Sequence, residues 1–166
     1  MTLTRLLAAG AALVLLALTP ARALTMRSVP FDDLVRQADG IARGTIVAKS
    51  AEWDAAHRYI LTRYTLRVDE TLKPGQFGNE ITFTELGGTV DGLTFGVPGT
   101  PEYRVGEEAI VFFHVERGRL MTLSWTQGQF AVRRDGGGAR VRQATGPVDE
   151  PLASFTARVR AIAGTR

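Results

Sequence analysis

The sequence predicts a mainly β protein, a small barrel with a short helix before it and a packing helix after it. From Ile41 onward, apolar residues alternate with polar ones, which is the period of a strand with one buried face. Glycine and proline clusters interrupt this alternation at intervals typical of turns. The last residues return to a spacing of three and four, which is the period of a helix.

The first helix is predicted over residues 28–38. Pro30 and the acidic pair Asp32 and Asp33 suit a helix start, where carboxylates face the positive end of the helix dipole. Phe31 and Leu34 then fall on one face at helical spacing.

The clearest strand is predicted at residues 60–72, and it ends at a turn that begins with Lys73 and Pro74. A strand of this length usually coils across a barrel. One face is apolar and consists of Ile60, Tyr64, Leu66, Val68 and Leu72. The other face is polar and consists of Arg63, Thr65, Arg67 and Asp69.

The remaining strands are predicted, in chain order, at residues 41–53, 80–86, 107–115, 120–125, 129–134 and 139–142. A loop rich in glycine and proline covers 87–106, and a linker covers 143–150. The closing helix is predicted at about 151–163, with Asp149 or Glu150 as its cap and Pro151 at its first position. Its apolar stripe consists of Leu152, Phe155, Val159 and Ile162. Five to seven strands with a packing helix indicate a barrel of the oligonucleotide/oligosaccharide-binding (OB) type.

Residues 1–23 have the pattern of a secretory signal peptide. Arg5 precedes an apolar run at 6–18, Pro20 interrupts the run, and Ala21 and Ala23 form a small-x-small cleavage site. Removal of 23 of the 166 residues leaves 143, the size of one domain. We therefore expect a secreted or periplasmic protein, 24–166, without a membrane anchor after cleavage.

Composition narrows the classes of function. Arg5 and Arg22 leave with the signal, so 18 basic and 17 acidic side chains remain, a net charge of +1. This balance argues against binding to nucleic acid through charge. The chain has no cysteine, which excludes a thiol nucleophile, a thiolate metal site and stabilisation by disulfides.

Three short segments resemble a known family. The pattern Ala38, Asp39, Ile41, Arg43 and Val47, where a helix runs directly into the first strand, is similar to the opening of the tissue inhibitors of metalloproteinases. The turn at 72–75 and the segment 118–123 resemble later parts of the same family, which belongs to the netrin-like superfamily of OB-type barrels. The chain resembles more closely a group of uncharacterised bacterial exported proteins, through the patterns at 87–88, 97–101 and 106–108.

The resemblance implies a binding protein whose partner is a protease. The inhibitors of that family chelate the protease zinc with an N-terminal cysteine that disulfides hold in place. Here the expected N-terminal residues are Leu24 and Thr25, and only the backbone is expected to tether 24–30, which we expect to be mobile. The inhibitory mechanism is therefore in doubt, whereas the expected fold is not.

Side chains that carry catalysis or hold metals are sparse. The histidines are His57, expected in a solvated turn, and His114, expected to be hydrogen-bonded in a strand, and a zinc site needs three or four ligands. Glu107 and Glu108 are adjacent, so they point to opposite faces of a strand and cannot flank one bond; we expect a solvated strand start. The sequence predicts no catalytic residue, cofactor or metal.

Two surfaces are candidates for binding. The first is the 87–106 loop with Leu93, Phe95, Val97 and Tyr103, which either binds a partner or plugs one end of the barrel. The second is formed by Arg133, Arg140 and Arg142, on the outer face of the last hairpin. They either bind an acidic partner or discourage pairing between sheet edges.

The leading hypothesis is an exported, non-enzymatic binding module that inhibits a protease, such as a metalloprotease, or associates with one. The alternative is an envelope scaffold or interaction protein that uses the 87–106 loop or the arginine hairpin. An enzyme ranks third. The sequence also predicts that the 152–162 stripe packs on the barrel.

The signal-peptide pattern predicts the N-terminus of the protein in its host. Cleavage after Ala23 should give a protein that begins at Leu24. Edman degradation of the protein purified from its host tests this, and a mature protein that still begins at Met1 would refute it.

Overall fold

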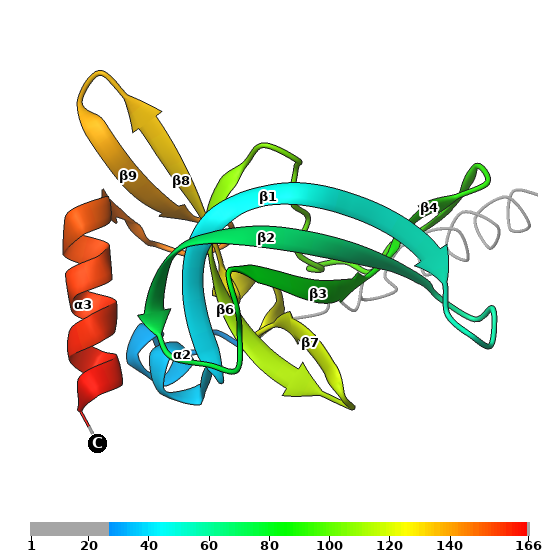
Figure 1. Cartoon of the computed structure of the whole chain (residues 1–166), viewed down its shortest axis with the longest axis horizontal. Helices are drawn as coiled ribbons and strands as arrows, with labels where there is room; N and C mark the ends of the chain where they lie inside the picture. The colour runs from blue at the N-terminus through cyan, green and yellow to red at the C-terminus, as the bar shows by residue number, and fades with distance from the viewer. Residues whose placement is uncertain (1–26, 166) are drawn as a thin grey trace, which may run out of the picture.

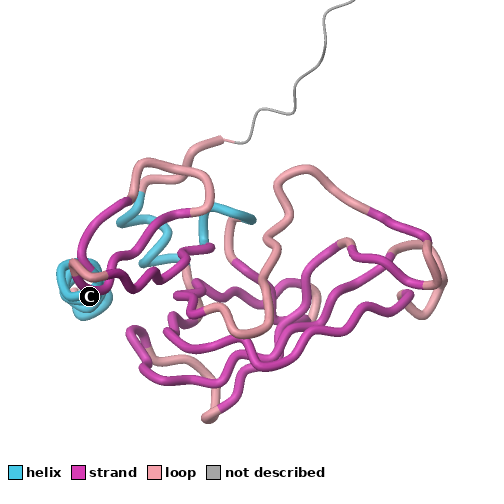
Figure 2. The backbone as a smooth tube through the Cα atoms, turned by 90° about the horizontal axis from the view of Figure 1, so that it is seen from above, coloured by secondary structure: helices cyan, strands magenta, loops and turns pink. Residues whose placement is uncertain are grey.

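The computed structural model describes residues 27–165, and it shows a strongly curled antiparallel sheet with two helices at one end (Figures 1 and 2). The helices are α2 (Phe31–Gln37), α3 (Leu152–Gly164) and a 3-10 turn η1 (Trp125–Gly128). The long strands are β1 (Gly40–Trp53), β2 (Ile60–Lys73), β3 (Glu80–Leu86), β6 (Glu108–Glu116), β8 (Gln129–Asp135) and β9 (Gly138–Gln143). The short strands are β4 (Gly88–Val90), β5 (Leu93–Phe95), β7 (Arg119–Thr122) and β10 (Asp149–Pro151).

The main sheet follows the order β10-β9-β8-β6-β1-β2-β3, and β7 pairs with β6 outside this path. Strands β4 and β5 form a separate hairpin that projects from the body (Figure 1). The sheet curls into a half-barrel, so the predicted mainly β fold with a short first helix and a closing helix is confirmed. Residues 1–23, the predicted signal peptide, lie outside the described residues.

Several local predictions are corrected. The first helix begins at Phe31 and is shorter than predicted. Trp125 does not extend a strand but begins η1. The predicted linker 143–150 holds the start of β10, whose backbone pairs with β9 from Asp149 to Pro151.

The predicted cap of the closing helix is also wrong. Pro151 is the N-cap of α3, and no side chain caps the helix. The carboxylates of Asp149 and Glu150 instead form ion pairs with Arg140 and Arg158. Asp149 thus pairs with a residue of β9, and Glu150 pairs with a residue in the middle of α3 and not with the backbone at its start.

The curled sheet buries side chains on both of its faces. Ile41 of β1 belongs to one apolar cluster and its neighbour Ala42 to another, because successive side chains of a strand point to opposite faces. Strand β6 is buried from Ala109 to Phe113 without interruption. One cluster lies under the two helices, and the other fills the inside of the half-barrel.

Bulges and a glycine let β1 follow this curvature. The pairing of β1 with β2 shifts register at three places, between Ile41 and Ala42, between Arg43 and Gly44, and between Ile46 and Ala48. A Cβ on Gly44 would lie 2.0 Å from the carbonyl oxygen of Arg67, so only glycine allows this close approach.

The helices are fastened to the sheet by both polar and apolar contacts. Lys73 Nζ, at the end of β2, donates hydrogen bonds to the carbonyl oxygens of Val35, Arg36 and Ala38, at 2.9, 2.9 and 2.5 Å. It therefore satisfies carbonyls that the end of α2 leaves without partners. Within residues 27–165, no helix combines the length and the hydrophobicity that crossing a membrane requires.

The predicted stripe of α3 packs on the sheet. Phe155 and Val159 are fully buried, and Leu152 and Ile162 pack partly buried against the same cluster. The Phe155 ring lies 5.0 Å from the ring of Phe130.

Phe155→Ala should lower the free energy of unfolding by about 3 kcal/mol, because it removes a fully buried aromatic ring and leaves a cavity. Chemical denaturation followed by circular dichroism measures this loss. Ser154→Ala, an exposed change in the same helix, is the control and should have little effect. A loss below about 0.5 kcal/mol for the phenylalanine variant would contradict docking of α3.

Candidate functional site

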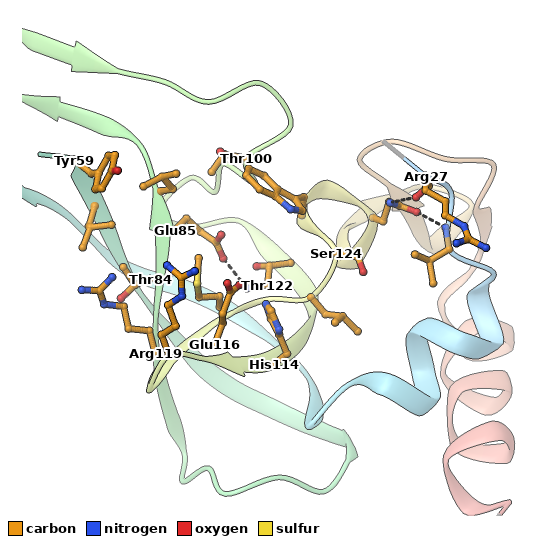
Figure 3. A pocket seen from close by; sticks show the side chains of 18 residues that line it. Arg27, Tyr59, Thr84, Glu85, Thr100, His114, Glu116, Arg119, Thr122 and Ser124 are labelled. Atoms are coloured by element: carbon orange, nitrogen blue, oxygen red, sulfur yellow. Dashed lines mark hydrogen bonds between the residues drawn. The ribbon is translucent and has the colours of Figure 1, made fainter. Parts of the chain in front are cut away.

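A cleft of about 700 Å³ opens at the side of the half-barrel (Figure 3). It lies between β3, β7, η1 and the residues that precede α2. Its lining is mixed. The apolar side chains are Val29, Leu61, Leu86, Met121, Leu123 and Trp125, and the polar ones include Arg27, Glu85, Thr100, His114, Glu116, Arg119, Thr122 and Gln127.

The cleft lies where the barrel does not close. Strands β3 and β7 run close together, yet no backbone ladder joins them in the described structure. The backbone N–H of Thr122 on β7 donates instead to Glu85 Oε1 on β3, at 2.8 Å. A side chain therefore bridges the two edges where backbone hydrogen bonds would close a full barrel (Figure 3).

Glu85 is 3% exposed, and it is the most deeply buried acid in the described chain. Burial raises the pKa of its carboxyl from 4.5 to about 7, and hydrogen bonds from the side chain and backbone of Thr122 oppose the rise. The carboxyl therefore changes charge near neutral pH, at the bottom of a cleft.

Two tyrosines complete the polar network beneath the cleft. Tyr103, fully buried, shares a hydrogen bond of 2.8 Å between its hydroxyl and Thr122 Oγ1. Burial, with the nearby Glu85 charge, raises the pKa of Tyr103 well above its ordinary value. Burial also raises the pKa of Tyr64 to about 12. Both hydroxyls thus stay protonated, and Thr122 connects the network to Glu85.

The mouth of the cleft presents charge and an aromatic ring. Arg27, Arg117 and Arg119 are exposed there. Trp125 is 41% exposed, and both Ser124 and Trp125 have positive φ values, 52° and 61°. This conformation costs about 1 kcal/mol per non-glycine residue, and such strain is common at functional sites.

The chain before α2 is held at the cleft by one side chain. Val29 N–H donates to Gln127 Oε1 at 2.8 Å, and Gln127 Nε2 donates to the Arg27 carbonyl at 3.1 Å. The expectation that only the backbone tethers 24–30 is therefore wrong for Arg27 and Val29. The candidate residues Leu24 and Thr25 lie outside the described residues.

The loop candidates separate into different environments. Tyr103 is fully buried inside the half-barrel, so it is not a surface residue and the plugging role holds for it. Val97 is half-buried beside a small cavity of about 70 Å³. Phe95 lies 5.8 Å from the ring of Tyr59, and Leu93 is 61% exposed.

The three arginines of the last hairpin share a face, as predicted. Arg133 lies directly opposite Arg140 in the register of β8 and β9, and Arg142 is two residues further along. Arg140 pairs with Asp149 at 2.7 Å, and β10 brings that aspartate next to Arg142. The arginine surface is thus partly neutralised by the chain itself.

The two histidines, the remaining candidates for a chemical role, lie in ordinary structural environments. His57 is exposed in a turn, as predicted, and stacks on Trp53. His114 is half-buried in the cleft wall, and its ring forms no hydrogen bond within residues 27–165, so the expectation of a hydrogen-bonded histidine is wrong. Within the same residues no three or more His, Asp or Glu side chains gather as for a metal ion.

The expected solvated strand start at Glu107 and Glu108 is wrong for Glu108. It is half-buried and pairs with Arg43 at 2.6 Å and Arg134 at 2.8 Å. The hydrogen bond from Arg134 and that from Arg43 hold the pKa of Glu108 below its ordinary value. Its partners come from β1 and β8, which adjacent letters in the sequence do not reveal.

Sequence reasoning missed Glu85, although a signal was present. Ile81, Phe83 and Glu85 alternate along β3, so the acid continues a buried apolar face. Trp125 and Gln127 carried no comparable signal, because their roles depend on contacts with distant residues.

Comparison with protein-family models, curated proteins and solved structures finds no match to this chain. The resemblance to the netrin-like inhibitors stays a prediction, and the site is argued from its own geometry.

Glu85 should make stability depend on pH. Its pKa is raised on folding, so the folded state binds more protons than the unfolded chain between the two values. The stabilisation by the protonated carboxyl is complete below the unfolded pKa, and it is lost as the pH rises through about 7. We expect a loss of up to about 3 kcal/mol between pH 4 and pH 8.

Urea denaturation of the wild type and of Glu85→Gln across this range isolates the effect. The variant should gain stability relative to the wild type as the pH rises. Glu116→Gln, at an exposed carboxylate of the same cleft, should show no such gain. A difference between wild type and Glu85→Gln that is equal at both ends of the range would contradict the raised pKa.

Proposed function

We propose that the chain is an exported binding module without catalytic activity of its own, and that it holds part of a partner in the cleft between β3, β7 and η1. The observation that supports this is the cleft, about 700 Å³ in volume, whose lining combines apolar side chains with polar and charged ones. Such a combination is typical of ligand sites.

The aromatic ring at the mouth supports binding. Trp125 keeps much of its surface exposed in a strained backbone, in a protein that buries most of its other rings. Exposed tryptophans in such positions are frequent hot spots of interfaces. The same cleft contains Ser124 and His114, but no hydrogen bond joins them in the described chain, and so we rank an enzyme lower.

An exported protease is the first class of partner to test, because the sequence resemblance implies a protease and the signal-peptide pattern predicts that this protein is itself exported. The Gln127 contacts support this proposal. They hold the chain before α2 in place, as disulfides hold the N-terminal residue of the inhibitors. Arg27 and Val29 are thus held at the cleft lining.

The second candidate is an envelope scaffold or interaction protein that uses the 87–106 loop. Leu93, with 61% of its surface exposed next to the turn of the β4–β5 hairpin, favours it. The arginine hairpin is less favoured, because Arg140 already forms an ion pair with Asp149.

A substitution that fills the cleft tests the proposal. Met121→Arg places a long charged side chain among the lining residues, whereas Val115→Arg makes a similar change on the exposed part of the same β6–β7 hairpin. Wild-type protein fixed through its C-terminus should capture a partner from the host's exported proteins. Met121→Arg should reduce that capture at least tenfold, and Val115→Arg should leave it within about twofold.

Thermal unfolding of the three proteins must first show that they fold. Equal capture by wild type and Met121→Arg would eliminate the cleft as the binding site. A further variant, Leu93→Arg, distinguishes the scaffold hypothesis, which predicts that this change and not Met121→Arg abolishes capture.

A further inference from the structure

Glu85 differs from the other partly buried acids in lacking a basic partner. Glu70, Glu108 and Glu150 are all more exposed than Glu85, and each pairs with at least one arginine. Glu85 takes part in no ion pair within residues 27–165, and it accepts a hydrogen bond from the Thr122 backbone. A buried carboxylate without a countercharge is unfavourable unless it is protonated or a cation approaches it.

The charge of the cleft changes from its buried end to its mouth. Glu85, 3% exposed, is the acid at the buried end, and the exposed charged residues of the lining are three arginines and one acid, namely Arg27, Arg117, Arg119 and Glu116. The lining of the cleft also includes apolar side chains, among them Leu86. A complementary ligand carries a cation at its inner end, an apolar stem, and an acceptor or anion at its outer end.

We propose that the cleft binds a primary ammonium group on a short alkyl chain, with the ammonium against the Glu85 carboxylate and a carbonyl or carboxylate among the rim arginines. This rests on the proposed function, since it names what the partner inserts. A lysine side chain of an exported protein and a small lysine-like amine share this chemistry. A simple diamine fits less well, because its second positive charge would meet the arginines.

Other ionisable groups surround Glu85 and have to be separated from it. They are Tyr64 on β2, Tyr103 in the connection before β6, His114 and Glu116 on β6, Arg119 on β7, and Lys49 and Glu102 beside the smaller cavity. The tyrosines do not titrate near neutral pH, because burial raises the pKa of both. His114 is the remaining group of the cleft wall that the experiment has to separate from Glu85.

Calorimetric titration of the mature protein at pH 8 tests the inference. One probe is Nα-acetyl-lysine, and the other is an acidic peptide with a single lysine, compared with the same peptide carrying norleucine there. The lysine probes should bind at least tenfold more tightly than the norleucine peptide. Glu85→Gln should remove most of that advantage, whereas Glu80→Gln, the same chemical change at an exposed position of the same strand and outside the cleft lining, should alter it less than about threefold.

The pH dependence gives a second readout. The lysine ammonium stays charged between pH 8 and pH 5.5, so protonation of Glu85 should weaken binding by roughly tenfold or more over this range. In Glu85→Gln the affinity should be independent of pH. If Glu85→Gln keeps the wild-type dependence of affinity on pH, a group other than Glu85 causes it and the inference is overturned.

The failure of this inference and of the proposed function can be told apart. Equal binding of lysine and norleucine probes, or no binding of either, overturns the ammonium inference. If Met121→Arg still abolishes capture of the partner, the binding function stands without it. Tighter binding of the lysine peptide than of Nα-acetyl-lysine identifies a protein as the source of the ammonium, and similar affinities identify a small amine.

Discussion

The structure depends on β1 burying side chains on both of its faces. Ile41 packs under the helices, while Ala42 and Ile46 point into the half-barrel. A strand covered on both sides must lie in the middle of the molecule, so its partners β2 and β6 curl around it and the helices cover the outer face. Strand β3, at one end of this curled sheet, then approaches β7, the branch that pairs with β6, and no ladder joins the two.

The cleft is a consequence of that incomplete closure. A ladder between β3 and β7 would satisfy their edges and leave little room between them. Here Glu85 and Thr122 make one contact across the gap, and side chains of η1 and of the segment before α2 complete the walls. The polarity of the site therefore comes from the residues that replace a backbone ladder, and the same acid both joins the edges and faces the cleft.

The parts that sequence predicts best are those with a local period. The strand at Ile60–Lys73 and the stripe around Phe155 follow from alternation and helical spacing, and the structure confirms both. Strand β10 and η1 were not predictable in this way, because three or four residues hold too little pattern. The cleft joins Glu85 to Thr122 and Val29 to Gln127, pairs 37 and 98 residues apart, and no local period reports such distances.

The hold of Gln127 on the chain before α2 has a practical consequence for work with this protein. Its own carbonyl accepts a hydrogen bond from Gln143 Nε2, so the glutamine is itself anchored to β9. An affinity tag or fluorescent reporter fused ahead of Arg27 would therefore start beside the cleft and compete with whatever enters it. A fusion after α3 starts from a helix that takes no part in the cleft lining. It therefore does not raise the local concentration of groups that compete with a ligand for the cleft.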